Sequence, residues 1–142
     1  MTTDGVSLAA FIILLFTMLY FQMTSPTFLL VKLDVPEVTR LMRGQFNFYF
    51  LALTIAAVVG TLAFSVAGRP LVAVEIAAIA AFAVFARRFF VRQIDAELSA
   101  RDNGDADAVR RLRQLHWRGM LLHAIPLAAV LASIPQVFAG WG

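Results

Sequence analysis

Long apolar runs, separated by clusters of basic residues, constrain this chain more than any other feature. All but one of its 12 Lys and Arg residues lie in two segments, 32–43 and 87–118. Residues 5–31, 45–68 and 119–142 carry no Asp, Glu, Lys or Arg, and residues 70–86 carry only Glu75. A bilayer core of about 30 Å is crossed by roughly 20 apolar residues in a helix. The pattern therefore predicts four membrane-spanning helices.

The placement of the basic clusters predicts the orientation of these helices. Lys and Arg collect in short loops on the cytoplasmic side of a membrane. Both clusters should then be cytoplasmic, which puts both termini outside, with Arg69 as the one stray cation in an outer turn. Heavy use of Arg and Ala is typical of bacteria with GC-rich genomes. We expect a multi-pass protein of a bacterial inner (cytoplasmic) membrane with periplasmic termini.

Composition supports the same class. The chain is 61% hydrophobic with a mean hydropathy of +0.80, and 142 residues have too little volume to hide so much apolar surface from water. A single transmembrane domain, 1–142, is expected. The net charge of +3 is explained by topology and by contact with anionic membrane lipids, so nucleic acid is not an expected partner. The absence of cysteine excludes disulfides and thiolate metal sites.

Breaker residues divide the chain into helices at about 6–31, 36–67, 70–102 and 106–139. Pro26 should kink or end the first helix, and Pro36, with Asp34 as a cap, should begin the second. The third helix has no breaker over about 50 Å at 1.5 Å per residue, which exceeds the bilayer core. The predicted fold is an all-α integral membrane four-helix bundle whose third and fourth helices extend into a cytoplasmic helical hairpin.

Small residues recur at every fourth position in three of the predicted helices. Such stripes allow helix backbones to approach closely in lipid, although alanine is also simply common here. If the stripes pack inside the bundle, the polar residues Glu75 and His123 point elsewhere, because they lie about 160° and 140° around their helices from the stripes. The stripes are Ala52, Ala56 and Gly60; Ala73, Ala77 and Ala81; and Ala124, Ala128 and Ala132.

Glu75 is the residue with most to explain. A carboxylate inside the hydrocarbon is costly and by default marks a proton path, an ion site or a contact with a partner. The alternative is structural. Glu75 lies five residues after Pro70, so it could reach the outer headgroups or sit protonated against Ser65 or Gln136.

Two histidines are the candidates for binding a cofactor. His116 or His123 could bind haem or a metal through its ring, although a lone histidine in a membrane more often forms hydrogen bonds that support packing. They share one helix face but lie about 10.5 Å apart along the axis, too far to bind one ion together. No catalytic motif is present. We expect no cofactor and no metal site.

The remaining polar residues gather in the inner third of the predicted helices. They could line an inward-facing pocket, or they could be the polar trim of a membrane interface, which the enrichment of Tyr and Trp at interfaces favours. Together with Glu75, the candidates for a partner contact or a proton path are Gln22, Tyr49 and His123. The other members of the group are Met23, Thr24, Ser25, Asn47 and His116.

Arg residues of the second basic cluster divide into two predicted roles. Those near the membrane boundary, with one tryptophan, should anchor to lipid headgroups: Arg87, Arg88, Arg92, Arg118 and Trp117. Those farther out on the hairpin, facing Asp95 and Glu97, should form a cytoplasmic partner surface: Arg101, Arg110, Arg111 and Arg113.

Several short motifs resemble the transmembrane protein 205-like family. They are Val35-Pro36, the tract Phe46-Asn47-Phe48-Tyr49-Phe50, the tripeptide Arg87-Arg88-Phe89 and the segment 112–116. The chain differs from the family pattern at Asn47, where Pro is usual, and at Trp117 and His123, where Gly and Asn are usual. The resemblance covers most of the chain and implies a four-helix membrane bundle.

Three classes of function follow from these observations. The first is a non-catalytic accessory or scaffold subunit that associates with other integral membrane subunits in a larger complex. It predicts that Glu75 meets a surface that a partner must cover. The second is a small proton-coupled transporter or exporter, which needs a polar path from Glu75 to the inner polar group. The third is a membrane enzyme that binds haem or metal through His116 or His123.

Overall fold

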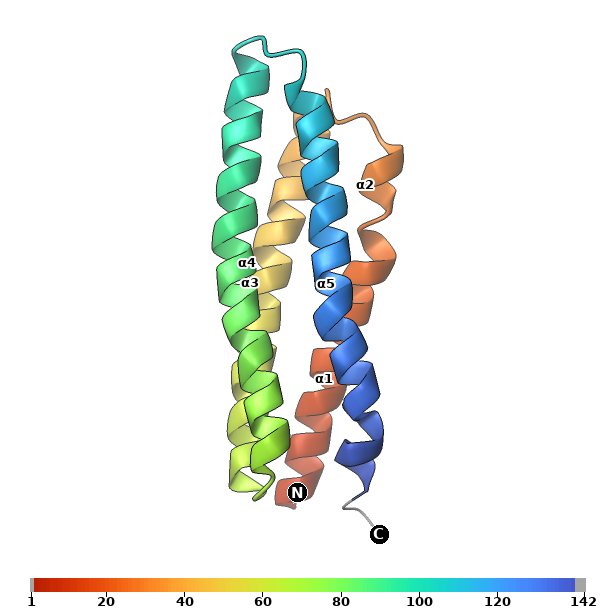
Figure 1. Ribbon diagram of the computed structural model, residues 1–142, viewed down its shortest axis with the longest axis vertical. Coiled ribbons are helices and arrows are strands. Elements are labelled where there is room, and N and C mark those ends of the chain that lie inside the picture. Colours follow the sequence, from red (N-terminus) through yellow and green to blue (C-terminus); the bar gives the residue numbers. More distant parts are fainter. Residues whose placement is uncertain (1, 140–142) are drawn as a thin grey trace.

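Four long helices run alternately up and down in the computed structural model, which describes residues 2–139 (Figure 1). The first crossing is divided into α1 (Thr3–Thr24) and the short α2 (Thr27–Leu30). It is followed by α3 (Pro36–Val66), α4 (Pro70–Asp102) and α5 (Ala108–Phe138). Residues 1 and 140–142 of the predicted domain lie outside the described range. Because the helices alternate in direction, α1 begins and α5 ends at the same end of the bundle.

The helices form a closed ring. α1 packs against α3 and α5, and α4 packs against the same two helices on the other side. Each of the four crossings is long and apolar enough to span a membrane. The predicted all-α bundle of four such helices is therefore confirmed.

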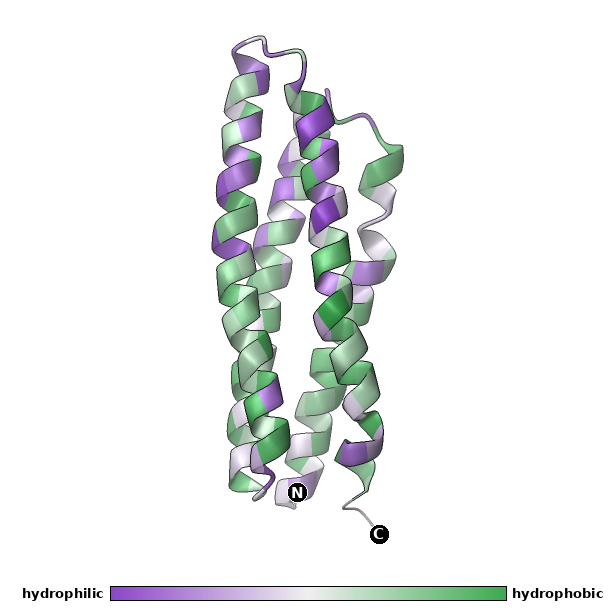
Figure 2. Cartoon of the chain, viewed as in Figure 1, coloured by the Kyte–Doolittle hydropathy of each residue, from purple (hydrophilic) through white to green (hydrophobic). Residues whose placement is uncertain are grey.

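The outer surface of the bundle is apolar over most of its length. Large apolar side chains lie open on all four long helices, for example Phe16 (67% exposed), Leu62 (62%), Leu71 (84%) and Ile125 (67%). Hydrophilic residues concentrate at the end where α4 meets α5 (Figure 2). An apolar belt of this extent is consistent with the membrane-spanning helices that the sequence predicts.

Element boundaries follow the predicted breakers with three differences. α1 begins at Thr3 instead of residue 6, because the hydroxyl of Thr2 accepts the Gly5 N–H at 3.3 Å and caps the helix. α3 begins at Pro36 as expected, but Val35 and not Asp34 is the N-cap residue. α5 begins at Ala108 instead of 106.

Ser25-Pro26 divides the first crossing, as predicted. Proline has no N–H and its ring obstructs the preceding turn, so the regular helix ends at Thr24. The chain resumes as α2 beside α5, where Phe28 packs edge-on against the ring of His116 at 5.7 Å between centroids.

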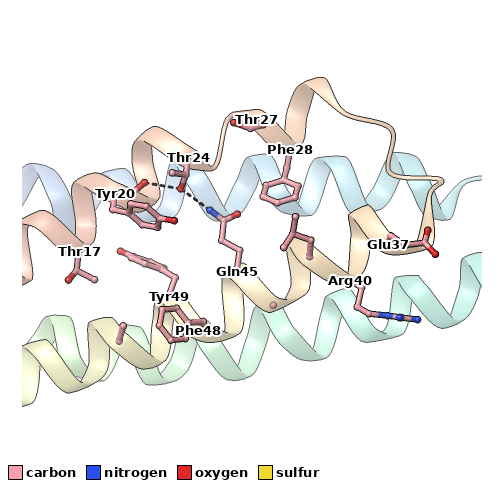
Figure 3. A pocket seen from close by; sticks show the side chains of 13 residues that line it. Thr17, Tyr20, Thr24, Thr27, Phe28, Glu37, Arg40, Gln45, Phe48 and Tyr49 are labelled. Atoms are coloured by element: carbon pink, nitrogen blue, oxygen red, sulfur yellow. Dashed lines mark hydrogen bonds between the residues drawn. The ribbon is translucent and has the colours of Figure 1, made fainter.

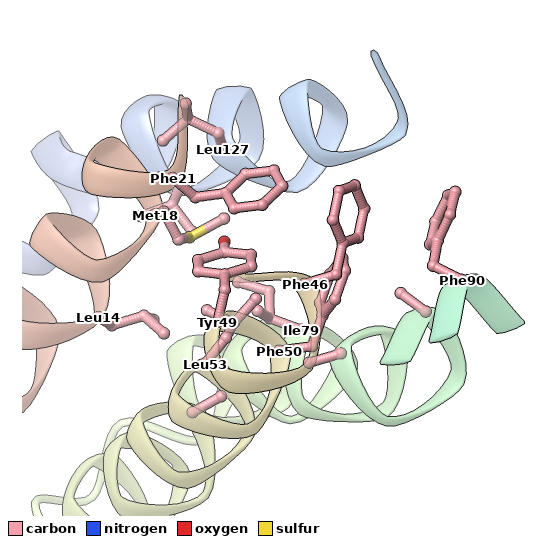
Figure 4. Packing of buried hydrophobic residues seen from close by; sticks show 14 of the residues in the cluster. Leu14, Met18, Phe21, Phe46, Tyr49, Phe50, Leu53, Ile79, Phe90 and Leu127 are labelled. Atoms are coloured by element: carbon pink, nitrogen blue, oxygen red, sulfur yellow. The ribbon is translucent and has the colours of Figure 1, made fainter. Parts of the chain in front are cut away.

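Aromatic side chains fill the centre of the bundle (Figure 4). Phe21, Phe46 and Phe50 are fully buried. The ring of Phe21 stacks on that of Tyr49 with centroids 4.0 Å apart, and Phe50 stacks on Phe90. Edge-on and stacked aromatic pairs each contribute about 0.5–1.5 kcal/mol beyond burial, so this cluster joins α1, α3 and α4.

Gly119 allows α5 to approach the aromatic cluster. A Cβ atom at this position would lie 2.8 Å from Cε1 of Phe46 and 3.3 Å from Cε1 of Phe90. Both rings are buried, so neither can move aside freely. The glycine is thus required by close packing between α5 and the rings.

The small-residue stripes do not all face inward. Gly60 and Ala73 are buried, but Ala128 and Ala132 are exposed, while His123 is fully buried. The expectation that the stripe of α5 packs inside and His123 points elsewhere was wrong. Only one face of α5 can point into the bundle. The face that carries the histidines does so, because the imidazoles form hydrogen bonds there.

The polar end of the bundle is more than a two-helix hairpin. The start of α3 packs against the extension of α4, where Arg43 forms a two-pronged ion pair with Asp95. Closer to the tip, Arg101 donates to the buried hydroxyl of Thr39 at 2.7 Å. Asp95 was expected to face the arginines of α5, and instead it faces α3.

Replacing Gly119 with Ala should destabilise the bundle by about 1–3 kcal/mol, because the added methyl overpacks the Phe46 ring. The matched control is Gly44→Ala in α3, where a Cβ meets nothing within 4 Å. The control should be neutral or up to about 1 kcal/mol more stable, since alanine favours helix. Reversible unfolding in mixed detergent micelles measures both. Equal effects at the two positions would contradict the packing described.

Candidate functional site

A buried hydrogen-bonded chain joins three helices at the centre of the molecule. The two ring nitrogens of His123 on α5 reach the hydroxyl of Tyr49 on α3 and the side-chain oxygen of Gln22 on α1, the latter at 3.2 Å. His123 is fully buried and Tyr49 is 3% exposed. Three of the four residues predicted as partner or proton-path candidates therefore come together.

The hydrogen-bond acceptors determine which atoms of these three side chains carry protons. The amide oxygen of Gln22 can only accept, so Nδ1 of His123 carries the proton that it donates. Nε2 is then the acceptor for the Tyr49 hydroxyl. The imidazole is neutral with both nitrogens occupied, which suits a residue held in an apolar core beside Phe21, 5.0 Å away between ring centroids.

His116 has a different role at the break in the first crossing. Its Nε2 donates to the carbonyl of Ser25 at 2.8 Å, between α1 and α2. Nδ1 of His116 and Oγ of Ser25 are buried with no hydrogen-bond partner within residues 2–139. The imidazole thus supplies a donor to the backbone where Pro26 interrupts the helix.

The histidines do not stand beside other potential metal ligands in the part of the chain that the structure describes. Within the described part of the chain, no three His, Cys, Asp or Glu side chains lie close enough to hold an ion. His116 retains one free ring nitrogen and His123 retains none. Both histidines bind other parts of the bundle, which is the packing interpretation of the sequence.

Glu75 lies apart from this centre, on the outer face between α4 and α5. It is partly buried and lines a depression of about 310 Å³. The other lining residues are apolar: Ala78, Ile79, Phe82, Leu122, Ile125, Pro126 and Ala129. We call this depression the Glu75 pocket.

The Glu75 carboxylate has no partner within residues 2–139. Neither Ser65 nor Gln136, the partners suggested by sequence, bonds to it. The Ser65 hydroxyl donates to the carbonyl of Thr61, and at Gln136 the main-chain carbonyl accepts from Arg69 at 2.7 Å. No polar residue lines the Glu75 pocket besides Glu75, so the pocket offers no polar path toward His123.

Sequence reasoning missed a second depression, between α1 and α3 (Figure 3). It has a volume of about 890 Å³ and continues toward the other end of the bundle into one of about 420 Å³, with Thr17, Phe48 and Ala52 lining both. We call the two together the α1–α3 groove. Two features of the sequence could have indicated it: the helix break at Pro26 and the glycine at position 44 within α3.

The predicted lipid anchors lie where the polar and apolar parts of the bundle meet. Arg88, Arg92 and Arg118 are exposed, and Trp117 is 49% exposed. Arg87 is partly buried because its Nε donates to the amide oxygen of Asn47 at 3.0 Å; the two residues join α4 to α3.

The arginines predicted to meet a cytoplasmic partner are mostly engaged within the chain. Arg101 binds Thr39, as described above. Arg113 donates to the backbone carbonyls of Leu29 and Val31, which ties α5 to the end of α2. These contacts leave little of either guanidinium to a partner.

The other two members of that set lie at the tip. Arg111 pairs with Glu97 at 2.8 Å and with Asp105 at 2.7 Å, which closes the α4–α5 turn. Arg110 pairs with Asp107 at 3.3 Å, and its side chain is 69% exposed. The most accessible cation of the predicted partner surface is thus Arg110.

No family model, curated protein or solved structure matches this chain. The resemblance to the transmembrane protein 205-like family stays a prediction from its motifs.

The Tyr49–His123 contact should be measurable as a coupling energy. In a double-mutant cycle of Tyr49→Phe and His123→Leu, we expect the single changes to be non-additive by about 0.6 kcal/mol and up to about 1.7 kcal/mol, the range for hydrogen bonds between membrane helices. Tyr20→Phe, at a tyrosine that is 65% exposed, is the control. Unfolding in detergent gives the energies, and strict additivity would show that the two side chains do not bond.

Acid should loosen the α4–α5 turn. The Arg111 guanidinium, followed by the Asp107 N–H, donates to Asp105 and lowers the pKa of that carboxyl below its usual value. A depressed folded-state pKa stabilises the fold above the unfolded pKa of about 3.9 and the effect is lost as pH falls further. Hydrogen-exchange protection factors at residues 103–107, which correct each rate for the intrinsic pH dependence of exchange, should fall in the wild type between about pH 6 and pH 3. Asp105→Asn should show low protection throughout, and wild-type protection that does not change with pH would contradict the assignment.

Proposed function

We propose that this chain is a non-catalytic, multi-pass membrane protein that works by association, as an accessory or scaffold subunit of a larger integral membrane complex. Its setting is the bacterial inner membrane, with both termini periplasmic and the basic clusters cytoplasmic. The polar end seen in Figure 2 would then lie beyond the cytoplasmic headgroups. The proposed kinship with the transmembrane protein 205-like family agrees with this membrane architecture.

The observation that carries the proposal is the unpartnered carboxylate in the Glu75 pocket. A carboxylate facing lipid is disfavoured unless it is protonated, reaches the interface or meets a donor. Glu75 lies about 7.5 Å along the helix from Pro70 by the 1.5 Å rise. Its neighbours in the pocket are apolar side chains. A transmembrane helix of another subunit, carrying a basic or hydroxyl side chain at that depth, would satisfy the carboxylate and cover those apolar neighbours.

The geometry gives less support to proton-coupled transport. That function needs polar groups from the Glu75 pocket to the Gln22–His123–Tyr49 chain, and apolar side chains line the pocket around Glu75. The polar chain itself has its hydrogen bonds satisfied on three helices. The hydrogen bonds of Gln22, His123 and Tyr49 are explained by their role in holding three helices together, and proton transfer is not needed to account for them.

The first test is co-purification from native membranes in mild detergent. Wild-type protein should bring down an integral membrane partner in stoichiometric amount. Glu75→Gln should weaken this association by about threefold to twentyfold, equivalent to about 0.6–1.7 kcal/mol for a lost interhelical hydrogen bond. Glu37→Gln, a carboxylate change on α3 at the opposite end of the bundle, is the matched control and should not alter it.

Photo-crosslinking tests the face directly. A photoreactive residue at Ala129, in the Glu75 pocket, should crosslink to the partner. The same residue at Leu62, which is 62% exposed on α3, should crosslink mainly to lipid. Recovery of the isolated chain alone, or an association that survives Glu75→Leu, would overturn the proposal.

A further inference from the structure

The α1–α3 groove exists because the first crossing is diverted at Ser25-Pro26. α1 follows α3 up to Thr24, and the chain then moves to α5 as α2. Arg113 on α5 holds the carbonyls at the end of α2, and His116 holds the carbonyl at the break. The N-terminal half of α3 therefore has no helix of the first crossing packed against one of its sides.

Gly44 deepens the groove at this point. It lies on α3 among the lining residues, and a Cβ there would meet nothing within 4 Å. Phe28 of α2 and Phe48 of α3 are apolar residues that line the same groove (Figure 3). A glycine within a helix costs about 1 kcal/mol relative to alanine, and here it leaves open space instead of making a close contact.

The groove changes character along its length. The smaller depression is apolar and is lined by residues such as Ile13, Ile55 and Val59, which belong to charge-free segments of the sequence. The larger depression, nearer the polar end of the bundle, contains a hydrogen bond across the groove, from the Gln45 amide to the Thr24 hydroxyl at 2.9 Å. The shape and polarity thus follow the order of a lipid, with the apolar portion deep and the polar portion at the boundary.

The mouth of the groove carries charges of both signs. Glu37 and Arg40 are exposed one helical turn apart, and neither takes part in an ion pair or side-chain hydrogen bond within residues 2–139. Below them the side-chain oxygen of Gln45 is buried without a hydrogen-bond partner in the same range. Along α3, the Arg40 guanidinium therefore lies between two acceptors, the Glu37 carboxylate and the Gln45 side-chain oxygen.

We propose that the α1–α3 groove binds one phospholipid with a zwitterionic, amine-bearing headgroup. Arg40 takes the phosphate, Glu37 takes the ammonium group, and an acyl chain lies along the groove past Gly44 and Phe48. The complementary charges at the mouth favour this occupant over a partner helix or a second copy of the chain. A lipid with only negative charge would leave Glu37 opposed by a like charge.

This inference rests on the proposed membrane insertion and is independent of the Glu75 pocket on α4 and α5. A failure of lipid binding leaves the association test through Glu75 unaffected, and the reverse also holds. The two sites are separated experimentally because their variants lie on different helices.

The experiment is native mass spectrometry of the full chain after reconstitution in an equal mixture of phosphatidylethanolamine and phosphatidylglycerol with identical acyl chains. Wild-type protein should retain one phosphatidylethanolamine in about tenfold preference, equivalent to about 1.4 kcal/mol. Glu37→Gln should bring the ratio of the two lipids close to one. Arg40→Gln should lower retention of both, whereas Arg110→Gln, the matched loss of an exposed arginine, should change neither.

Filling the groove tests the acyl-chain part of the site. Gly44→Leu places a side chain in open space and should remove retention of both lipids. Ala52→Leu, which enters the groove where its two parts meet, is the second variant if the first disturbs folding. Size-exclusion profiles and unfolding curves show whether each variant retains its fold.

A photoactivatable phosphatidylethanolamine provides an independent readout. It should label peptides of α3 that contain Phe48, and Gly44→Leu should abolish that label. Equal retention of both lipids by wild-type protein, unchanged retention in both filled variants, or a protein dimer in place of the bound lipid would each overturn the proposal.

Discussion

The break at Ser25-Pro26 is the constraint on which most of the asymmetry of this bundle depends. An unbroken first helix would have covered α3 along its full length. Proline prevents this, and the buried carbonyl groups near the break need donors from inside the protein. His116 and Arg113 supply them from α5. The helix break at Ser25-Pro26 therefore brings α2 into contact with α5 and leaves the α1–α3 groove open.

Polar groups within the bundle are placed according to whether the chain itself can satisfy them. His123 turns inward because Gln22 and Tyr49 meet both of its nitrogens, and that choice turns the alanine stripe of α5 outward. Glu75 finds no such partners and stays on the outer face. The same rule, that an unsatisfied polar group is costly in an apolar medium, thus produces a closed centre and an open carboxylate.

Several features could be predicted because they depend on neighbours along the chain. Pro26 was expected to kink or end the first helix because proline lacks an N–H, and the separation of basic clusters by charge-free runs predicts helices of membrane-spanning length without knowledge of packing. Other features could not be predicted. Asp95 was assigned to the arginines of α5, and it binds Arg43 of α3 because the start of α3 lies beside the extension of α4. Asp34, a plausible helix cap by sequence, does not act as one.

The sequence by itself determined the number and approximate limits of the long apolar helices and the apolar character of the surface, since local backbone chemistry and hydropathy act residue by residue. Only the tertiary structure decided which face of each helix points inward. That rotation depends on pairs far apart in the chain, such as Tyr49 with His123 and Gly119 with Phe46. It is why Gln22, Tyr49 and His123 meet while Glu75 stands apart, and why Gly44 borders open space. The energies of such contacts arise only when the helices are assembled.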